Sequence, residues 1–224
     1  MKKIVLSLGG SVLLRKDNDT YFLRNLSKML LDISTKYQLY IVIGGGVTAR
    51  TYITRGRTLG LHEIKLDELG IAITRVNAQF FSMTLGLPST SVPNTTEEAA
   101  HRKESLVIMG GTTPGHSTDM VGAELAQKLQ AERFVIATDV TGVYDKDPNT
   151  NKDAKLFNTI SIDTLIKTYG TSWETAGKNT VIDGPALKII QQAKIPTYVV
   201  NGLVLPQLKK ALLGEPFEGT SIQV

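Results

Sequence analysis

The sequence predicts a single α/β domain, a three-layer α/β/α sandwich around a central, mainly parallel sheet. Strand-like and helix-like segments alternate along all 224 residues. Strands separated by helices of this length are typical of parallel sheets that are covered on both faces. Glycine-rich loops follow several of the strands, and no low-complexity linker or internal repeat interrupts the alternation. We therefore expect one domain over residues 1–224.

Short β-branched runs and apolar residues at helical spacing predict the elements of the first part of the chain. In chain order we expect a strand at 3–8, a helix at 21–37, a strand at 39–43, a helix from Val47, a long amphipathic helix at 66–85, a weak strand at 89–92 and a short helix from Asn94. The helix at 21–37 carries six apolar residues on one face. They are Phe22, Leu23, Leu26, Met29, Leu30 and Ile33.

The same signals continue to the end of the sequence. We expect strands at 105–109 and 133–137 with a helix from Asp119 to about Gln130 between them, then a polar, turn-rich segment at 138–153. There follow a strand at 155–161, a short helix, a helix at 184–194, a strand at 196–200, a helix at 205–214 and a final short strand at 219–224.

Composition narrows the function classes. The chain is 42% hydrophobic and 21% charged, has no cysteine and carries a net charge of +4. Disulfides, thiolate nucleophiles and cysteine–metal sites are therefore excluded. The basic residues are scattered and aromatic residues are few, which argues against a nucleic-acid partner. No segment approaches membrane-spanning length and no signal-peptide pattern is complete, so we expect a cytoplasmic protein with no membrane partner.

The stretch "GGTTPGHSTD", residues 110–119, raises the main question of function. It is rich in glycine and hydroxyl side chains and has only one certain charge, Asp119. A strand leads into it and a helix leads out, which is a usual way to hold an anion by backbone N–H groups. Because the loop has no Lys or Arg, positive charge must come from elsewhere.

Two further glycine-rich loops follow strands, Gly9-Gly10-Ser11 and Gly44-Gly45-Gly46. Ligands of parallel sheets sit outside the carboxyl ends of the strands. Any one of these loops alone is more often a tight turn. Three of them at strand ends predict a site that binds phosphates at more than one point.

Two known phosphate-binding motifs fit less well. The only Gly-Lys pair, Gly177-Lys178, is followed by Asn179, and Ser172 stands where a Walker A loop needs glycine. The run Gly44–Ala49 fits the dinucleotide pattern G-x-G-x-x-A, with Glu63 or Asp67 about twenty residues further on. It follows the second strand, however, and leaves the other two loops unexplained, so a dinucleotide site remains a weak alternative.

Other chemistries are also weaker. Ser117 beside His116 suggests a serine hydrolase, but Asp119 breaks the G-x-S-x-G elbow, and Ser117 and Thr118 fit better as helix caps or as donors to an anion. The histidines have no i, i+4 pair, so a histidine metal site is not expected. His62 and His101 are expected at the surface, Trp173 in packing, and His116 in either ring packing or catalysis. The aspartates at 139, 145 and 147 suggest a cation site or a turn.

Taken together, the stretches resemble the amino acid kinase family over essentially the whole chain. "TDVTGVYDKDP", residues 138–148, is similar to the family's nucleotide-binding loop, and the first Gly-Gly-Ser to its phosphate loop. "DELGIAITRVNAQ", residues 67–79, resembles the signature of the uridylate kinases, with its Thr-x-x-Asn helix. "GGTTPGHSTDMVGAELA", residues 110–126, resembles the acceptor loop of the archaeal type of that enzyme.

The resemblance implies transfer of a phosphoryl group from ATP to UMP with Mg²⁺, in pyrimidine nucleotide biosynthesis. It also implies a homohexamer, a trimer of dimers, in which about 1–132 of each chain binds UMP and about 133–224 binds ATP. The implied catalytic residues are Gly9, Gly10, Ser11 and Asp119. The implied UMP-binding residues are Gly45, Asp67, Thr112, Thr113, Pro114, Gly115, His116, Ser117 and Thr118. The implied ATP-binding residues are Gly9, Gly10, Gly46, Arg50, Thr138, Asp139, Tyr144 and Asp147.

On this interpretation the charge-poor loop holds UMP by backbone donors and hydroxyls, while Mg²⁺ and Arg50 supply positive charge. Asp119 would orient the loop rather than act as a base. No base is needed, because the second pKa of a phosphate ester is about 6 and the acceptor is already largely dianionic at neutral pH.

One departure from the family concerns a lysine. Many members carry Lys two residues before the first glycine pair, where this sequence has Ser7. Lys3, Lys178 or Lys188 would have to supply that charge. Two alternatives therefore stay open: a relative that phosphorylates another small acid or phosphate, and a nucleotide sensor without turnover.

Overall fold

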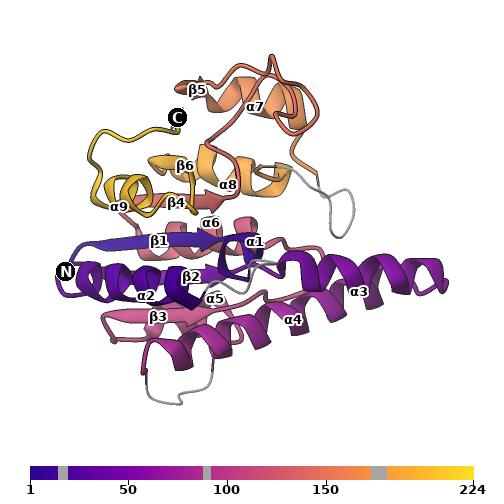
Figure 1. Cartoon of the computed structure of the whole chain (residues 1–224), viewed down its shortest axis with the longest axis horizontal. Coiled ribbons are helices and arrows are strands. Elements are labelled where there is room, and N and C mark those ends of the chain that lie inside the picture. The colour runs from indigo at the N-terminus through magenta and orange to yellow at the C-terminus, as the bar shows by residue number, and fades with distance from the viewer. Residues whose placement is uncertain (15–19, 88–91, 173–180) are drawn as a thin grey trace.

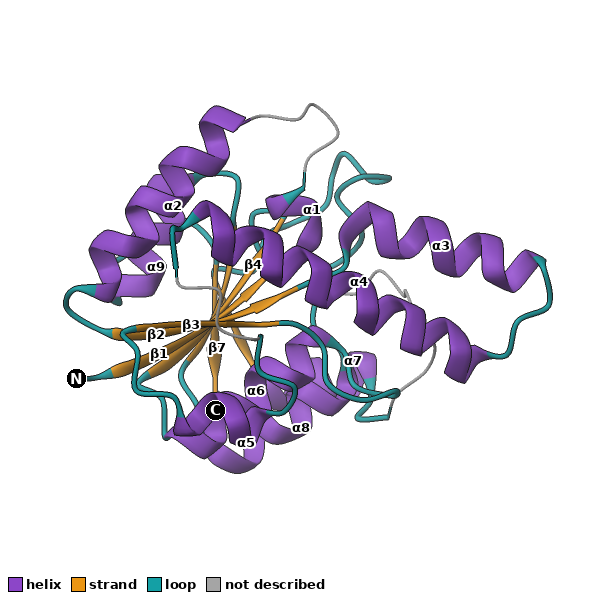
Figure 2. Ribbon diagram, turned by 90° about the horizontal axis from the view of Figure 1, so that it is seen from below, coloured by secondary structure: helices purple, strands orange, loops and turns teal. Residues whose placement is uncertain are grey.

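A computed structural model describes residues 1–14, 20–87, 92–172 and 181–224. Its centre is a seven-stranded sheet with the order β3-β2-β1-β4-β6-β7-β5. The strands are β1 (Lys3–Leu8), β2 (Gln38–Ile43), β3 (Leu106–Met109), β4 (Arg133–Thr138), β5 (Thr159–Ser161), β6 (Thr197–Asn201) and β7 (Thr220–Gln223). Helices lie on both faces of the sheet (Figures 1 and 2), so the expected three-layer α/β/α fold is confirmed.

The sheet is parallel over its first five strands in spatial order. β2 pairs with both β3 and β1, β1 with β4, and β4 with β6, all in parallel. β7 then runs antiparallel to β6, and β5 is parallel to β7. The residues of β3 are all buried, as the continuous apolar runs of a doubly covered sheet require. The prediction of a mainly parallel sheet is therefore correct.

Most of the helices form two layers. The helices are α1 (Gly10–Leu13), α2 (Thr20–Ser34), α3 (Gly46–Thr58), α4 (Glu63–Thr84), α5 (Thr96–His101), α6 (Thr118–Leu129), α7 (Ile162–Tyr169), α8 (Gly184–Ala193) and α9 (Leu205–Leu213). The buried side chains of α2, α4 and α9 form one core with one face of the sheet. Those of α5, α6, α7 and α8 form a second core with the other face. The helix α3 packs on α4 in a smaller cluster of its own.

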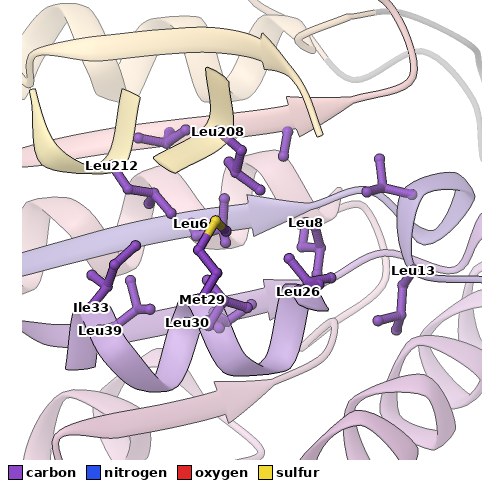
Figure 3. Close-up of a cluster of buried hydrophobic side chains, with 14 of the residues drawn as sticks. Leu6, Leu8, Leu13, Leu26, Met29, Leu30, Ile33, Leu39, Leu208 and Leu212 are labelled. Carbon is purple, nitrogen blue, oxygen red and sulfur yellow. The ribbon is translucent and has the colours of Figure 1, made fainter. Parts of the chain in front are cut away.

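Figure 3 shows how α2 and α9 meet the first core. The buried apolar residues of α2 recur at helical spacing, and Leu26 and Leu30 are fully buried beside Leu6 and Leu8 of β1. An apolar stripe of this kind packs on a sheet because each buried side chain removes hydrocarbon surface from water. The helix face expected from the sequence is confirmed by Phe22, Leu26, Met29, Leu30 and Ile33, which are buried.

Some boundaries differ from the expected ones. The short helix expected from Asn94 begins at Thr96, because the Thr95 side chain accepts a hydrogen bond from the Glu98 N–H and caps it. The strand expected at 155–161 is only the three residues of β5. The one-turn helix α1 was not expected. Residues 88–91 of the weak strand, and Trp173, lie outside the described residues. No described helix has the length and apolar character needed to cross a bilayer.

Candidate active site

A cavity of about 330 Å³ opens where the parallel strands end. It is lined by the ends of β1 and β4 and by the loops that follow β2 and β3. In the sheet β1 lies between β2 and β4. β2 is the next strand in the sequence, whereas β4 comes only after β3. The chain thus changes direction across the sheet between β1 and β4, which is the usual position of a ligand in this class of fold.

Four helices begin at this cavity. Its lining includes Gly10 at the start of α1, Gly46 at the start of α3, Thr118 at the start of α6 and Gly184 at the start of α8. The first N–H groups of a helix have no partner within the helix, and the helix dipole is positive at that end. Four such ends around one cavity favour a ligand with several negative charges.

The loops after β1 and β2 touch each other at this point. A Cβ on Gly10 would collide with the backbone nitrogen of Gly46, and Gly46 itself has φ +63°. Both positions therefore require glycine, one for close approach and one for its backbone conformation. The two backbones can then present their N–H groups to the same ligand.

Formal charges in the lining are mostly negative. Of the described lining residues, Arg50 is the single arginine or lysine, whereas the aspartates are Asp67, Asp119, Asp139 and Asp183. The positive potential of the helix ends is thus offset by carboxylates. A polyanionic ligand would need a cation that accompanies it.

Asp119 lies in the first turn of α6, and its partly buried side chain lines the cavity. Its Oδ1 accepts a hydrogen bond of 2.7 Å from the hydroxyl of Ser7, which is itself 2% exposed on β1. Burial, together with the nearby carboxyl of Asp183, raises the pKa of Asp119 to about 7, and the Ser7 hydrogen bond opposes that rise. At neutral pH the Asp119 carboxyl can therefore be protonated or ionised.

Asp183 is the N-cap of α8, which packs against α6 on the same face of the sheet. Its Oδ1 accepts a hydrogen bond of 3.0 Å from the Ala186 N–H, and its Oδ2 is buried without a hydrogen-bond partner among the described residues. Burial raises the pKa of Asp183, while the nearby Ser117 hydroxyl and the Ala186 N–H oppose that rise. The sequence analysis missed Asp183, although an Asp directly before Gly-Pro and an apolar helix is an N-cap signal.

Most residues implied by the resemblance meet at the cavity. The lining contains Gly9, Gly10, Ser11, Gly45, Gly46, Arg50, Asp67, His116, Ser117, Thr118, Asp119, Thr138 and Asp139. Ser117 caps α6 by accepting a hydrogen bond from the Met120 N–H, as the helix-cap interpretation expected. The buried Nδ1 of His116 has no hydrogen-bond partner among the described residues.

Other implied residues lie outside the described lining, namely Thr112, Thr113, Pro114, Gly115, Tyr144 and Asp147. Gly115 instead donates its N–H to Oδ2 of Asp67, at 2.6 Å. Tyr144 forms an isolated bridge with Leu156, and Asp147 accepts the N–H of Asn149 in a turn. The side-chain hydrogen bond of Asp119 runs to Ser7 of β1, and its expected role in orienting the acceptor loop stays a prediction.

No lysine is among the described residues of the lining. Lys3 lies at the amino end of β1, opposite to the cavity, and Lys188 lies exposed on α8. Lys178 lies outside the described residues. The hydroxyl of Ser7, at the position of the family's lysine, donates its hydrogen bond to Asp119.

The sequence was compared with protein families and with curated proteins. The sequence model of the amino acid kinase family matches residues 2–201. A uridylate kinase of Archaeoglobus fulgidus is 40% identical over 95% of this chain and 96% of its own length. One of Methanocaldococcus jannaschii is 43% identical over 89% and 91%.

Solved structures show the same likeness. The crystal structure of the uridylate kinase from Archaeoglobus fulgidus superposes with a TM-score of 0.84 and 39% identity, covering 99% of this chain and 100% of that one. The UMP kinase from Bacillus anthracis, 20% identical, superposes with a TM-score of 0.80 over 99% of this chain and 96% of its own, which shows the common fold.

Proposed function

The chain belongs to the amino acid kinase family, and from this premise we propose that it is a UMP kinase, which transfers the γ-phosphoryl group of ATP to UMP. The observation that carries the proposal is the convergence of four helix N-termini on one cavity between β1 and β4. Similarity to uridylate kinases along nearly the whole chain supports UMP as the acceptor.

In the proposed reaction a phosphate oxygen of UMP attacks the γ-phosphorus of ATP. A new phosphorus–oxygen bond gives UDP, and the bond between the γ-phosphorus and the β,γ-bridging oxygen breaks to release ADP. The acceptor oxygen is already ionised, so the protein has to align the reactants and offset their negative charge. Backbone donors at helix ends are suited to both tasks.

The proposed roles of the residues follow from their places in the lining. Gly9, Gly10 and Ser11 would face the transferring phosphoryl group, and Gly45 the UMP phosphate. Gly46, Arg50, Thr138 and Asp139 would face ATP. Asp67 would bind the UMP ribose while it holds Gly115. Tyr144, Asp147 and residues 112–115 remain proposed contacts outside the cavity, and 1–132 and 133–224 remain the proposed UMP and ATP halves.

We propose Mg²⁺ as the cation that accompanies ATP. The described residues contain no group of three or more side chains placed to hold a metal ion. The ion would therefore be held mainly by phosphate oxygens, as Mg²⁺ usually is in such sites, with the carboxylates of Asp119 and Asp183 nearby. When bound, it would neutralise charge on the phosphates.

The remaining expectations also stand as proposals. A UMP kinase would act in the cytoplasm in pyrimidine nucleotide biosynthesis. We propose a homohexamer made of three dimers, supported by the apolar residues that α4 leaves exposed, namely Val76, Phe80 and Met83. Surface apolar groups of this kind often mark contacts between subunits.

An ADP-release assay with Mg-ATP tests the proposal, with UMP, CMP, dUMP, AMP and GMP in parallel. We expect the turnover rate with UMP to be well above the rates with the other nucleotides. Arg50→Ala should raise KM for ATP, because Arg50 is proposed to face ATP. Turnover of a different small phosphate in place of UMP would establish the alternative relative. Saturable binding of UMP without turnover would establish the nucleotide sensor and give Ser7 its explanation.

A further inference from the structure

The Thr-x-x-Asn pattern of α4 contacts both glycine-rich loops that flank the acceptor side of the cavity. Asn77 is 4% exposed, and its Nδ2 donates to the carbonyl oxygens of Gly44 at 2.9 Å and Gly45 at 3.3 Å. Two carbonyl oxygens can be satisfied only by the amide nitrogen, so the orientation of this side chain is fixed by its partners.

These bonds set the direction of the loop's N–H groups. In a trans peptide the C=O and the following N–H point in opposite directions, and the described chain has no cis peptide. With the carbonyls of Gly44 and Gly45 turned toward Asn77, the N–H groups of Gly45 and Gly46 point away from it. Gly45 and Gly46 line the cavity.

The neighbouring residues of α4 hold the loop after β3. Thr74 Oγ1 accepts the N–H of Gly111 at 2.7 Å and donates to the carbonyl of Ile71. Arg75 Nε donates to the carbonyl of the same Gly111 at 3.1 Å. Both backbone groups of Gly111 are thus held by one helix. Asp67 lies seven residues, or about two turns, before Thr74 on α4, and its carboxylate accepts the N–H of Gly115 in the same loop.

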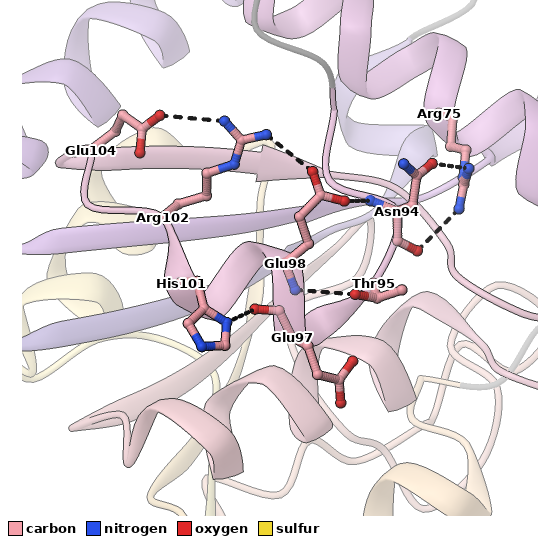
Figure 4. A network of polar contacts seen from close by, with 8 residues as sticks. All are labelled: Arg75, Asn94, Thr95, Glu97, Glu98, His101, Arg102 and Glu104. Atoms are coloured by element: carbon pink, nitrogen blue, oxygen red, sulfur yellow. Dashed lines mark hydrogen bonds and ion pairs between the residues drawn. The ribbon is translucent and has the colours of Figure 1, made fainter.

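Arg75 is also anchored from outside the cavity. Figure 4 shows its guanidinium facing Asn94, with Nη1 2.6 Å from Asn94 Oδ1 and Nη2 3.1 Å from the Asn94 carbonyl. The Asn94 N–H in turn donates to Glu98 of α5. A planar guanidinium held at three nitrogens has little freedom to move, so it fixes the Gly111 carbonyl.

We propose that Arg75 and Asn77 are positioning residues of the phosphoryl transfer, through which one helix sets the loop 110–118 and the loop 44–46 in register. Arg75 acts through Gly111 on the loop 110–118, and Asn77 acts through Gly44 and Gly45 on the loop that faces both substrates. Neither side chain needs to touch the substrates. This inference rests on the proposed function for its kinetic part.

Steady-state kinetics with separate variation of UMP and ATP test the two assignments. Charged hydrogen bonds are the stronger kind, so Arg75→Ala should raise KM for UMP by about tenfold or more, with KM for ATP changed less than about twofold. Arg75→Lys keeps one donor and should restore part of the loss. Asn77→Leu, which has nearly the same shape but cannot donate, should lower kcat by about tenfold or more, with a smaller change in KM for UMP.

Matched controls lie on the same helix. Lys65 pairs with Glu68 at the surface of α4, and Gln79 is an exposed amide. Lys65→Ala and Gln79→Ala should leave all kinetic constants near those of the wild type. Thermal unfolding of every variant shows which of them remain folded.

Hydrogen exchange of the peptide 110–118 without substrate gives a readout that needs no activity. Arg75→Ala should speed exchange there, whereas Lys65→Ala should not. Normal exchange, or equal increases in KM for both substrates, would overturn the role of Arg75. A lower melting temperature with unchanged kcat and KM would leave both residues merely structural and overturn the proposal. If the wild type does not phosphorylate UMP, the proposed function fails, whereas the exchange result still decides whether Arg75 holds the loop.

Discussion

Asp119 has a strongly raised pKa among the charged residues of the site. Its carboxyl is buried beside the carboxyl of Asp183, so the pKa of Asp119 is raised from 3.8 to about 7. Between these two values the folded chain binds a proton that the unfolded chain has released. This group therefore makes the folded state less stable as the pH rises from about 4 to about 7.

Replacing Asp119 with asparagine tests this pH dependence. Asparagine can still accept the Ser7 hydroxyl but cannot ionise. Asp119→Asn should therefore leave stability nearly unchanged at pH 4 relative to wild type and raise it at pH 8, by up to about 4 kcal/mol. Urea unfolding of both proteins across this pH range measures the difference. An equal difference at both pH values would contradict the raised pKa.

Ser7 offers a second test of the same contact. Its hydroxyl donates to the carboxylate and opposes the rise of the Asp119 pKa. Ser7→Ala should therefore raise that pKa further, and the loss of stability with increasing pH should extend to higher pH. The double variant with Asp119→Asn serves as control, because without the carboxyl the change at position 7 should no longer affect the pH dependence.

Single contacts of this kind are the part of the site that the sequence did not predict. Ser7 and Asp119 are 112 positions apart in the chain, and no local pattern couples them. The sequence did predict that Ser7 lies near the end of a strand and Asp119 at the start of a helix. On α4, the side chains of Asp67, Thr74 and Arg75 hold the acceptor loop by hydrogen bonds that the sequence did not predict. The role expected for Asp119 in orienting that loop stays a prediction.

At the scale of elements, the contact between α1 and α3 depends on the absence of side chains. A Cβ at Gly10 would meet the backbone of Gly46 and Gly44. Gly10→Ala should therefore destabilise the fold by about 2 to 4 kcal/mol and reduce activity, because backbone cannot move aside as a side-chain tip can.

Gly86 serves to measure the cost of an unfavourable backbone conformation without the steric overlap found at Gly10. Gly86 also has a positive φ, but among the described residues nothing lies within 4 Å of the position of its Cβ. Gly86→Ala should cost only about 1 kcal/mol. Equal costs at Gly86 and Gly10, measured by denaturant unfolding, would show that the α1–α3 contact is not tight.

β7 fixes the segment between β4 and β5 through one buried hydroxyl. Thr220 is fully buried, accepts the Val143 N–H at 2.9 Å and donates to the Phe157 carbonyl at 2.5 Å. Thr220→Val keeps the shape and leaves both backbone groups unpaired, so we expect a loss of about 2 to 4 kcal/mol. Thr220→Ser, which retains the hydroxyl, should lose much less in the same unfolding experiment.

Across the whole molecule, the element types followed from the sequence more readily than their partners. The buried face of α2 was predicted correctly, because its apolar residues recur at a spacing that places them on one side of a helix. The antiparallel direction of β7 and the shortness of β5 depend on how the last strands meet β6, which their composition does not encode. One-turn α1 was missed because four residues are too few to show a period.

The α3–α4 hairpin exposes apolar side chains on α4. The two helices lie side by side and project past the carboxyl edge of the sheet (Figures 1 and 2). On α4, Val76 is 60% exposed, Phe80 42% and Met83 60%, whereas Phe81 is buried in the core. These spacings of three and four residues form a continuous apolar stripe on the helix surface.

If the proposed hexamer forms through this stripe, a charge within it should separate the subunits, because the ionised group would have to be buried without a partner. Phe80→Glu should therefore reduce the mass found by light scattering during size-exclusion chromatography. Tyr21 is an exposed aromatic residue on α2, 75% exposed, and Tyr21→Glu should leave the mass unchanged. An unchanged mass for Phe80→Glu, with wild-type stability, would place the subunit contacts on another surface. A parallel fall in activity would show that the assembly also stabilises the site, since α4 holds both glycine-rich loops.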